Sequence, residues 1–91
     1  MTDTKMLIGS LSSDLYRVAS LIGRGSNTGA SRFFIEAQKW SLQLSNVEAK
    51  KHVKNIIEDI NSDTQLDHTL EQAEKFLMYS VLLQNYSLHI D

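Results

Sequence analysis

The sequence predicts an all-α protein: a small four-helix up-and-down bundle whose last helix is the longest and is central to packing or dimerisation. Its 91 residues contain no proline and only four glycines, so few positions interrupt a helix. Apolar residues make up 42% of the chain, and they recur at helical spacings. This length fits a single helical domain, residues 1–91, close to the size at which oligomerisation often supplements a thin core.

The first helix is expected at residues 5–22, where apolar side chains recur at spacings of three and four: Leu7, Leu11, Leu15, Val18 and Ile22. Its start is open, because Gly9 and the serines that follow can delay nucleation, and Ser10 or Ser12 can act as the N-cap. The segment 23–29 has the composition of a loop, with three glycines that tolerate positive φ. It is the clearest boundary in the chain.

The second helix is expected at residues 30–44, with two apolar faces. One face consists of Ala30, Phe33, Ala37, Trp40 and Leu44. Ile35 and Leu42 form a second apolar line on nearly the opposite side. Two apolar faces require two neighbours.

The third helix is expected at residues 47–60. Ser45 and Glu48 fit a capping box, in which the serine side chain accepts a hydrogen bond from the amide three residues on and the glutamate reaches back to the serine amide. The inward face of this helix comprises Ala49, Val53, Ile56, Ile57 and Ile60.

The fourth helix is expected at residues 65–86, after a polar turn in which Ser62 and Gln65 offer another capping box. Its stretch 76–83 is apolar on nearly every side, so its own bundle or a second copy of the protein must surround it. At 1.5 Å per residue this helix is roughly 33 Å long, against roughly 20 Å for the second and third. We therefore expect an apolar overhang at its end: Leu82, Leu83, Tyr86, Leu88 and Ile90.

A second protomer is the simplest cover for such an overhang. Small side chains seven residues apart, Ala73, Ser80 and Ser87, also form a seam that another helix can approach closely. The sequence thus favours a protein that acts by protein–protein interaction, as an adaptor or regulator. The expected partners are a second copy of itself and an unidentified protein, with this interface: Ile35, Leu42, Leu82, Leu83 and Tyr86.

The alternative interpretation is a protein that senses a small anion or nucleotide at the glycine-rich loop. Its candidate residues are Arg17, Arg24, Gly25, Gly29 and Arg32, beside the free amides at the start of the second helix. The loop is not a P-loop, because no lysine follows Gly29 and no strand precedes the loop. Glycines are also what a short connection between antiparallel helices requires.

No residue pattern identifies a reaction, so we expect neither catalysis nor a cofactor. Glu48 precedes His52 by one turn, and His68 precedes Glu71 by three residues. These pairs do not match the Glu-x-x-His motif of carboxylate-bridged metal sites, because the spacing of the first and the order of the second differ. Solvated pairs on a helix surface are the favoured interpretation, and no metal is expected.

The net charge of −2 makes nucleic acid an unlikely partner, since such binding depends on accumulated positive charge. The small basic patch at Lys50, Lys51, His52 and Lys54 is offset by nearby acids. No run of eighteen apolar residues occurs, so no membrane span is expected. The chain has no cysteine and needs no oxidising compartment, which favours the cytoplasm.

Overall fold

The computed structural model describes residues 3–62 and 65–90, and this part of the chain folds into four helices with no strand. Helices cover 79% of these residues, so the predicted fold class is confirmed. The elements are α1 (Thr4–Gly23), α2 (Asn27–Gln43), α3 (Lys51–Ser62) and α4 (Leu70–Leu88). Within the described ranges, no helix combines the length and the apolar character that crossing a bilayer requires.

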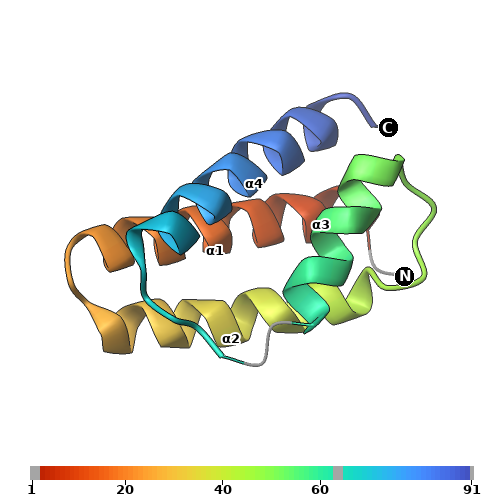
Figure 1. Ribbon diagram of the computed structural model, residues 1–91. Coiled ribbons are helices and arrows are strands. Elements are labelled where there is room, and N and C mark those ends of the chain that lie inside the picture. Colours follow the sequence, from red (N-terminus) through yellow and green to blue (C-terminus); the bar gives the residue numbers. More distant parts are fainter. Residues whose placement is uncertain (1–2, 63–64, 91) are drawn as a thin grey trace.

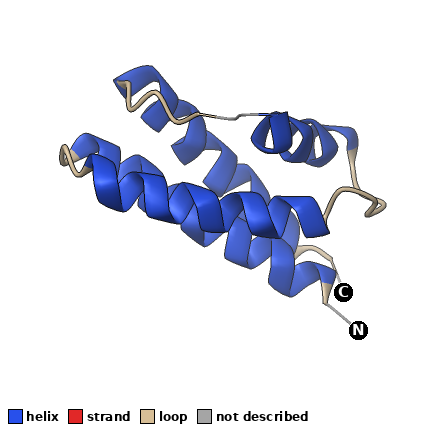
Figure 2. Cartoon of the chain, turned by 90° about the horizontal axis from the view of Figure 1, so that it is seen from below, coloured by secondary structure: helices blue, strands red, loops and turns tan. Residues whose placement is uncertain are grey.

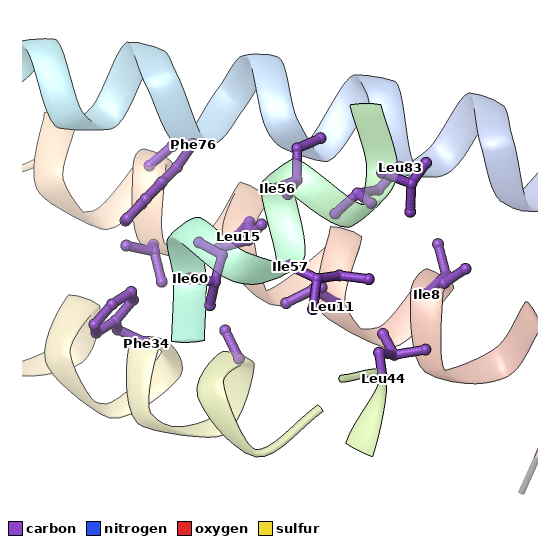
Figure 3. Close-up of a cluster of buried hydrophobic side chains, with 14 of the residues drawn as sticks. Ile8, Leu11, Leu15, Phe34, Leu44, Ile56, Ile57, Ile60, Phe76 and Leu83 are labelled. Atoms are coloured by element: carbon purple, nitrogen blue, oxygen red, sulfur yellow. The ribbon is translucent and has the colours of Figure 1, made fainter. Parts of the chain in front are cut away.

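Helix α1 lies between α2 and α4 and packs against both of them (Figure 1). The shorter α3 begins near the C-terminal part of α4 and runs steeply back towards α2 (Figures 1 and 2). The core lies where the four helices face one another, and Figure 3 shows side chains from each of them meeting there. Its largest fully buried apolar side chains are Phe76, Ile8, Leu11, Leu15, Leu44, Ile60, Leu83, Val18 and Val53.

Helix α1 begins earlier than the serine cluster and ends at the predicted loop. Asp3 caps its start by accepting a hydrogen bond from the amide of Lys5. At its end the amides of Gly25 and Ser26 donate to the carbonyls of Ile22 and Leu21. This is a Schellman motif, and Gly25 supplies the positive φ of 78° that the motif requires.

Helix α2 begins at Asn27, three residues before the expected start. Gly29 therefore lies within its first turn and not in a loop. Positive φ does not explain this glycine, because Gly25 is the only described glycine that has it. A Cβ atom at Gly29 would lie 2.9 Å from Ser26 Oγ and 3.3 Å from Leu21 Cδ1, so a larger residue here would require the side chains of Ser26 and Leu21 to shift.

The buried face of α2 differs from the predicted stripe by one residue at two positions. Phe34 and Ser41 are buried, whereas Phe33 and Trp40 are only partly buried. The Ser41 hydroxyl donates to the carbonyl of Ile57 in α3, so its polarity is satisfied inside the core. Adjacent residues are rotated by 100° about the helix axis, so a shift of one residue turns the buried face only partly. Packing against the neighbouring helices determines which of the two residues faces inward.

The capping box predicted at Ser45 and Glu48 is wrong, because α3 begins at Lys51. The chain does leave the helix at Leu44, as expected, but Val47 and Ala49 belong to the connection. Both are partly buried against the core. Packing of this apolar connection replaces the helical turn that the sequence pattern suggested.

Helix α4 begins at Leu70, five residues later than expected, and Ser62 is the last residue of α3. Residues 63 and 64, in the expected turn before this helix, lie outside the described part of the chain. The true N-cap is Thr69, whose side chain accepts from the amide of Gln72. The Gln72 side chain in turn accepts from the amides of two preceding residues, Asp67 and His68, which fixes the loop before the helix.

The predicted overhang of the last helix is wrong. Helix α4 has 19 residues and is not the longest, since α1 has 20. The two helices lie side by side along their lengths (Figure 1). Leu83 is fully buried, and Tyr86 and Ile90 pack against the core.

Candidate functional site

An exposed groove of about 660 Å³ runs between α1 and α4. Its lining contains small residues from both helices, Gly9, Ser12, Ser13, Ser80 and Ser87. The same lining contains bulky exposed residues, Tyr16, Leu77, Val81 and Leu88. A groove with small residues between large apolar ones has a shape that accepts the side chains of another helix.

The small residues also explain why α1 and α4 lie so close together. The Ser12 hydroxyl donates to the carbonyl of Ser80 at 2.6 Å, which joins the two helices near their midpoints. Ala73, Ser80 and Ser87 are all buried. The seam of small side chains predicted in the last helix therefore receives α1 of the same chain.

The face formed by α1 and α4 carries few charges, and Arg17 is the charged residue in the lining of the groove. Residues 76–88 contain no Asp, Glu, Lys, Arg or His, and neither do residues 6–13. The exposed apolar side chains of the two stretches include Met6, Leu77, Met78, Val81 and Leu82, of which Leu77 and Val81 line the groove. Depletion of charge around exposed large apolar side chains is typical of the centre of a protein–protein interface.

None of the five predicted interface residues lines this groove, and Leu82 and Tyr86 line another hollow beside Lys50 and His52. Leu82 is exposed on α4, but Leu83 lies in the core and Tyr86 is partly buried. Ile35 and Leu42 are exposed on α2 and do not line the groove. The sequence analysis named Leu88 in the overhang and Ser80 and Ser87 in the seam, but it did not place Leu77 and Val81 at an interface, although Leu77, Val81 and Leu88 recur at intervals of four and seven.

The arginines of the glycine-rich loop do not converge on one point. Arg17 pairs with Asp14, at 3.0 Å between guanidinium nitrogen and carboxylate oxygen, and its guanidinium lies over the ring of Phe33. Arg24 is the exposed C-cap of α1, whereas Gly29 and Arg32 line a separate hollow together with Glu36. The negative charge of Glu36 would repel an anion in that hollow.

The histidines considered as metal ligands lie apart from one another. His52 packs edge-on against Tyr86, and the Nε2 atom of His68 lies 3.4 Å from the hydroxyl of Ser31. Glu48 is exposed in the α2–α3 connection. Among the described residues, no three histidine or carboxylate side chains come close enough to hold a metal ion.

A buried acid on α1 is a further polar site that the sequence analysis did not identify. Asp14 is only 1% exposed, and it accepts hydrogen bonds from Trp40 Nε1 at 2.9 Å and from Arg17 at 3.0 Å. Burial and the neighbouring Glu36 side chain raise its pKa above the ordinary value near 3.8, although Trp40 and Arg17 act in the opposite direction. The spacing of Asp14 is the sequence signal for this burial. Asp14 lies three residues after Leu11 and four before Val18, so it shares the apolar face of the first helix.

We expect Asp14→Asn to reduce the pH dependence of stability. A raised pKa means that the folded protein holds a proton more tightly than the unfolded chain, so this site stabilises the fold at acidic pH. That contribution is lost as the pH rises from near 4 through the raised pKa. The free energy of unfolding of the wild type should therefore fall relative to that of Asp14→Asn, measured by denaturant titration with the single tryptophan, Trp40, as the fluorophore.

Glu36→Gln is the matched variant, because it removes the neighbouring charge and keeps the buried acid. In Glu36→Gln, the fall in the free energy of unfolding with rising pH should still occur, but at lower pH than in the wild type. If the difference in the free energy of unfolding between Asp14→Asn and the wild type is constant over this pH range, the pKa of Asp14 is not raised in the folded protein.

No protein-family model, curated protein or solved structure matches this chain. The arrangement of its own residues is therefore the basis for a functional proposal.

Proposed function

We propose that this protein acts by protein–protein interaction, in an adaptor or regulatory role, and that it forms a homodimer in the cytoplasm. The observation that carries this proposal is the exposed groove between α1 and α4, whose lining is small and apolar apart from Gln84 and Arg17. An unidentified protein is the further partner that an adaptor role requires.

Exposure of this face to water is unfavourable, because burial of apolar surface contributes roughly 25 cal/mol for each Å² removed from water. The exposed large apolar residues on α4 alone are Leu70, Leu77, Met78, Val81, Leu82 and Leu88. Single exposed apolar side chains are ordinary, but the series from Leu77 to Leu88 has no intervening charge, which is typical of a binding surface.

A second copy suits this surface because the face is complementary to itself. It presents apolar side chains on α4 beside a groove whose lining includes glycine and serine. In a two-fold dimer each copy offers the same patch, so the projecting residues of one can enter the groove of the other. One contact then covers both exposed faces.

Val81→Glu is expected to give a folded protein that dimerises at least about tenfold more weakly than the wild type, a change of about 1.4 kcal/mol. Val81 is 50% exposed in the single chain, so the glutamate can remain in water there without disturbing the core. In the dimer the same carboxylate would be buried without a partner, which is costly. Sedimentation equilibrium measures the dissociation constant, and circular dichroism checks the helix content.

Leu42→Glu is the matched control, because Leu42 is equally apolar and more exposed but lies on α2. This variant should dimerise like the wild type. If Leu42→Glu abolishes dimerisation and Val81→Glu does not, the groove between α1 and α4 is not the interface.

The anion-sensing alternative has less support. Its guanidinium groups are divided between an ion pair with Asp14, an exposed helix end and a hollow shared with Glu36. Its test is thermal stabilisation by inorganic phosphate. Such stabilisation should be absent from a variant with both Arg24 and Arg32 replaced by alanine.

A further inference from the structure

We propose that the hollow between the start of α3 and the end of α4 binds a small organic acid that has one aromatic ring and one carboxylate. The hollow has a volume of about 290 Å³. It shares no lining residue with the groove between α1 and α4, so this site is separate from the proposed dimer contact. Three features carry the proposal: the aromatic and apolar floor of the hollow, the basic side chains around it, and its size.

Two segments that are distant in the sequence form this hollow. Figure 1 shows the start of α3 beside the C-terminal part of α4. From α3 come the two residues on either side of its first residue, Lys50 and His52. From the end of α4 comes a set of residues that recur at intervals of three and four and therefore share one face, Leu82, Asn85, Tyr86 and His89.

The floor of the hollow is apolar and aromatic. It contains Leu82, Tyr86 and Ile90, and the last two pack against the core, which holds them in place. The ring of His52 meets the ring of Tyr86 edge-on, with the centroids 6.2 Å apart and the planes at 88°. Two perpendicular rings form a corner in which a flat aromatic ring can stack on one and contact the edge of the other.

The polar groups of the hollow are suited to an anion. Lys50 provides a positive charge, and each imidazole of His52 and His89 can donate a hydrogen bond in either protonation state. No described acidic residue lines the hollow, and Lys50 belongs to neither of the described ion pairs. A carboxylate in this position would therefore accept charge-assisted hydrogen bonds without repulsion from a neighbouring acid.

The volume of the hollow limits the size of the ligand. At about 30 Å³ for each water-sized group, the hollow holds roughly ten non-hydrogen atoms. A benzene ring with a short acidic side chain has this size, and phenylacetate is such a molecule. We therefore use phenylacetate as the probe for this site.

Binding can be measured by titrating phenylacetate into the isotope-labelled protein and following the backbone amide signals by NMR. The expected result is a saturable shift of the signals from residues 50–52 and 82–90, with a dissociation constant of about 1 mM or tighter. The absence of saturable shifts in these two segments, at phenylacetate concentrations well above this value, would overturn the proposal.

Two related molecules test which part of the ligand is recognised. Phenylacetamide keeps the ring and removes the charge, whereas acetate keeps the charge and removes the ring. Each should bind severalfold more weakly than phenylacetate. If phenylacetamide binds as tightly, the basic side chains do not select an acid, and if acetate binds as tightly, the aromatic floor does not select a ring. Either result would overturn the proposed ligand class.

Lys50→Glu and Lys51→Glu form a matched pair of variants. Both lysines are exposed and adjacent, and both substitutions change the net charge equally, but only Lys50 lines the hollow. An acidic residue is favourable near the start of a helix, so both variants should keep the helix content of the wild type in circular dichroism.

The two variants should differ in their affinity for phenylacetate. Lys50→Glu should weaken binding at least about tenfold, because it replaces an attractive charge by a repulsive one, and Lys51→Glu should weaken it less than about threefold. If both variants lose affinity equally, phenylacetate responds to the charge of the whole surface, and the assignment of the hollow as its site is wrong.

Discussion

Leu83→Glu is expected to abolish the folded state. The Leu83 side chain is completely buried, and Figure 3 shows it in the core among side chains of other helices. A carboxylate there has neither water nor an opposite charge, and such burial costs more than about 4 kcal/mol, a large fraction of the stability of a small domain. Circular dichroism should show loss of most of the helical signal at 25 °C.

The adjacent residue provides the control for this substitution. Leu82 is 37% exposed, so the carboxylate of Leu82→Glu can reach water and the helical signal should be retained. Equal loss of structure in both variants would show that α4 is turned differently about its axis.

Phe76→Ala is expected to lower the free energy of unfolding by about 3–5 kcal/mol, the range observed for the loss of a buried aromatic ring. Phe76 is 0% exposed, and its ring stacks against that of Phe34 with a centroid separation of 5.6 Å. The substitution removes this contact between α4 and α2 and leaves a cavity. Chemical denaturation monitored by circular dichroism measures the change.

Leu77→Ala is the matched variant, because Leu77 follows Phe76 directly but is 43% exposed on the groove. It should change the stability of the single chain by less than about 1 kcal/mol. A similar loss for both substitutions would contradict the described core.

The fold class and the loop at residues 23–29 could be predicted because their signals are local. A glycine in the Schellman position and a leucine repeat before it depend on a few adjacent residues. The orientation of α2 depends on packing against α1 and α3. For this reason the sequence could not distinguish Phe34 from Phe33 as the buried residue.

The starts of the last two helices could not be predicted because the capping pattern is not unique. Ser45, Ser62 and Thr69 are each followed three residues later by glutamate or glutamine. Of these three residues, only Thr69 caps a helix in the described part of the chain. Which pattern is used depends on where the connection packs against the core, and this is a tertiary effect.

The predicted overhang is absent because the neighbour of α4 differs from the one that the sequence suggests. The overhang follows from the lengths of the second and third helices, but α4 lies along α1, which starts at Thr4 because Asp3 caps it. The resulting pair buries Leu83 and leaves Val81 outside. The apolar character of the last helix was therefore recognised correctly, while its exposed face depends on pairing that the sequence does not reveal.

The mass of the unmodified protein in solution tests the proposed homodimer most directly. Sedimentation equilibrium at micromolar concentrations should give a mass approaching twice the 10.3 kDa of the chain, with a shift towards one chain on dilution. A constant mass of 10.3 kDa at every concentration would contradict the proposed self-association through the groove between α1 and α4.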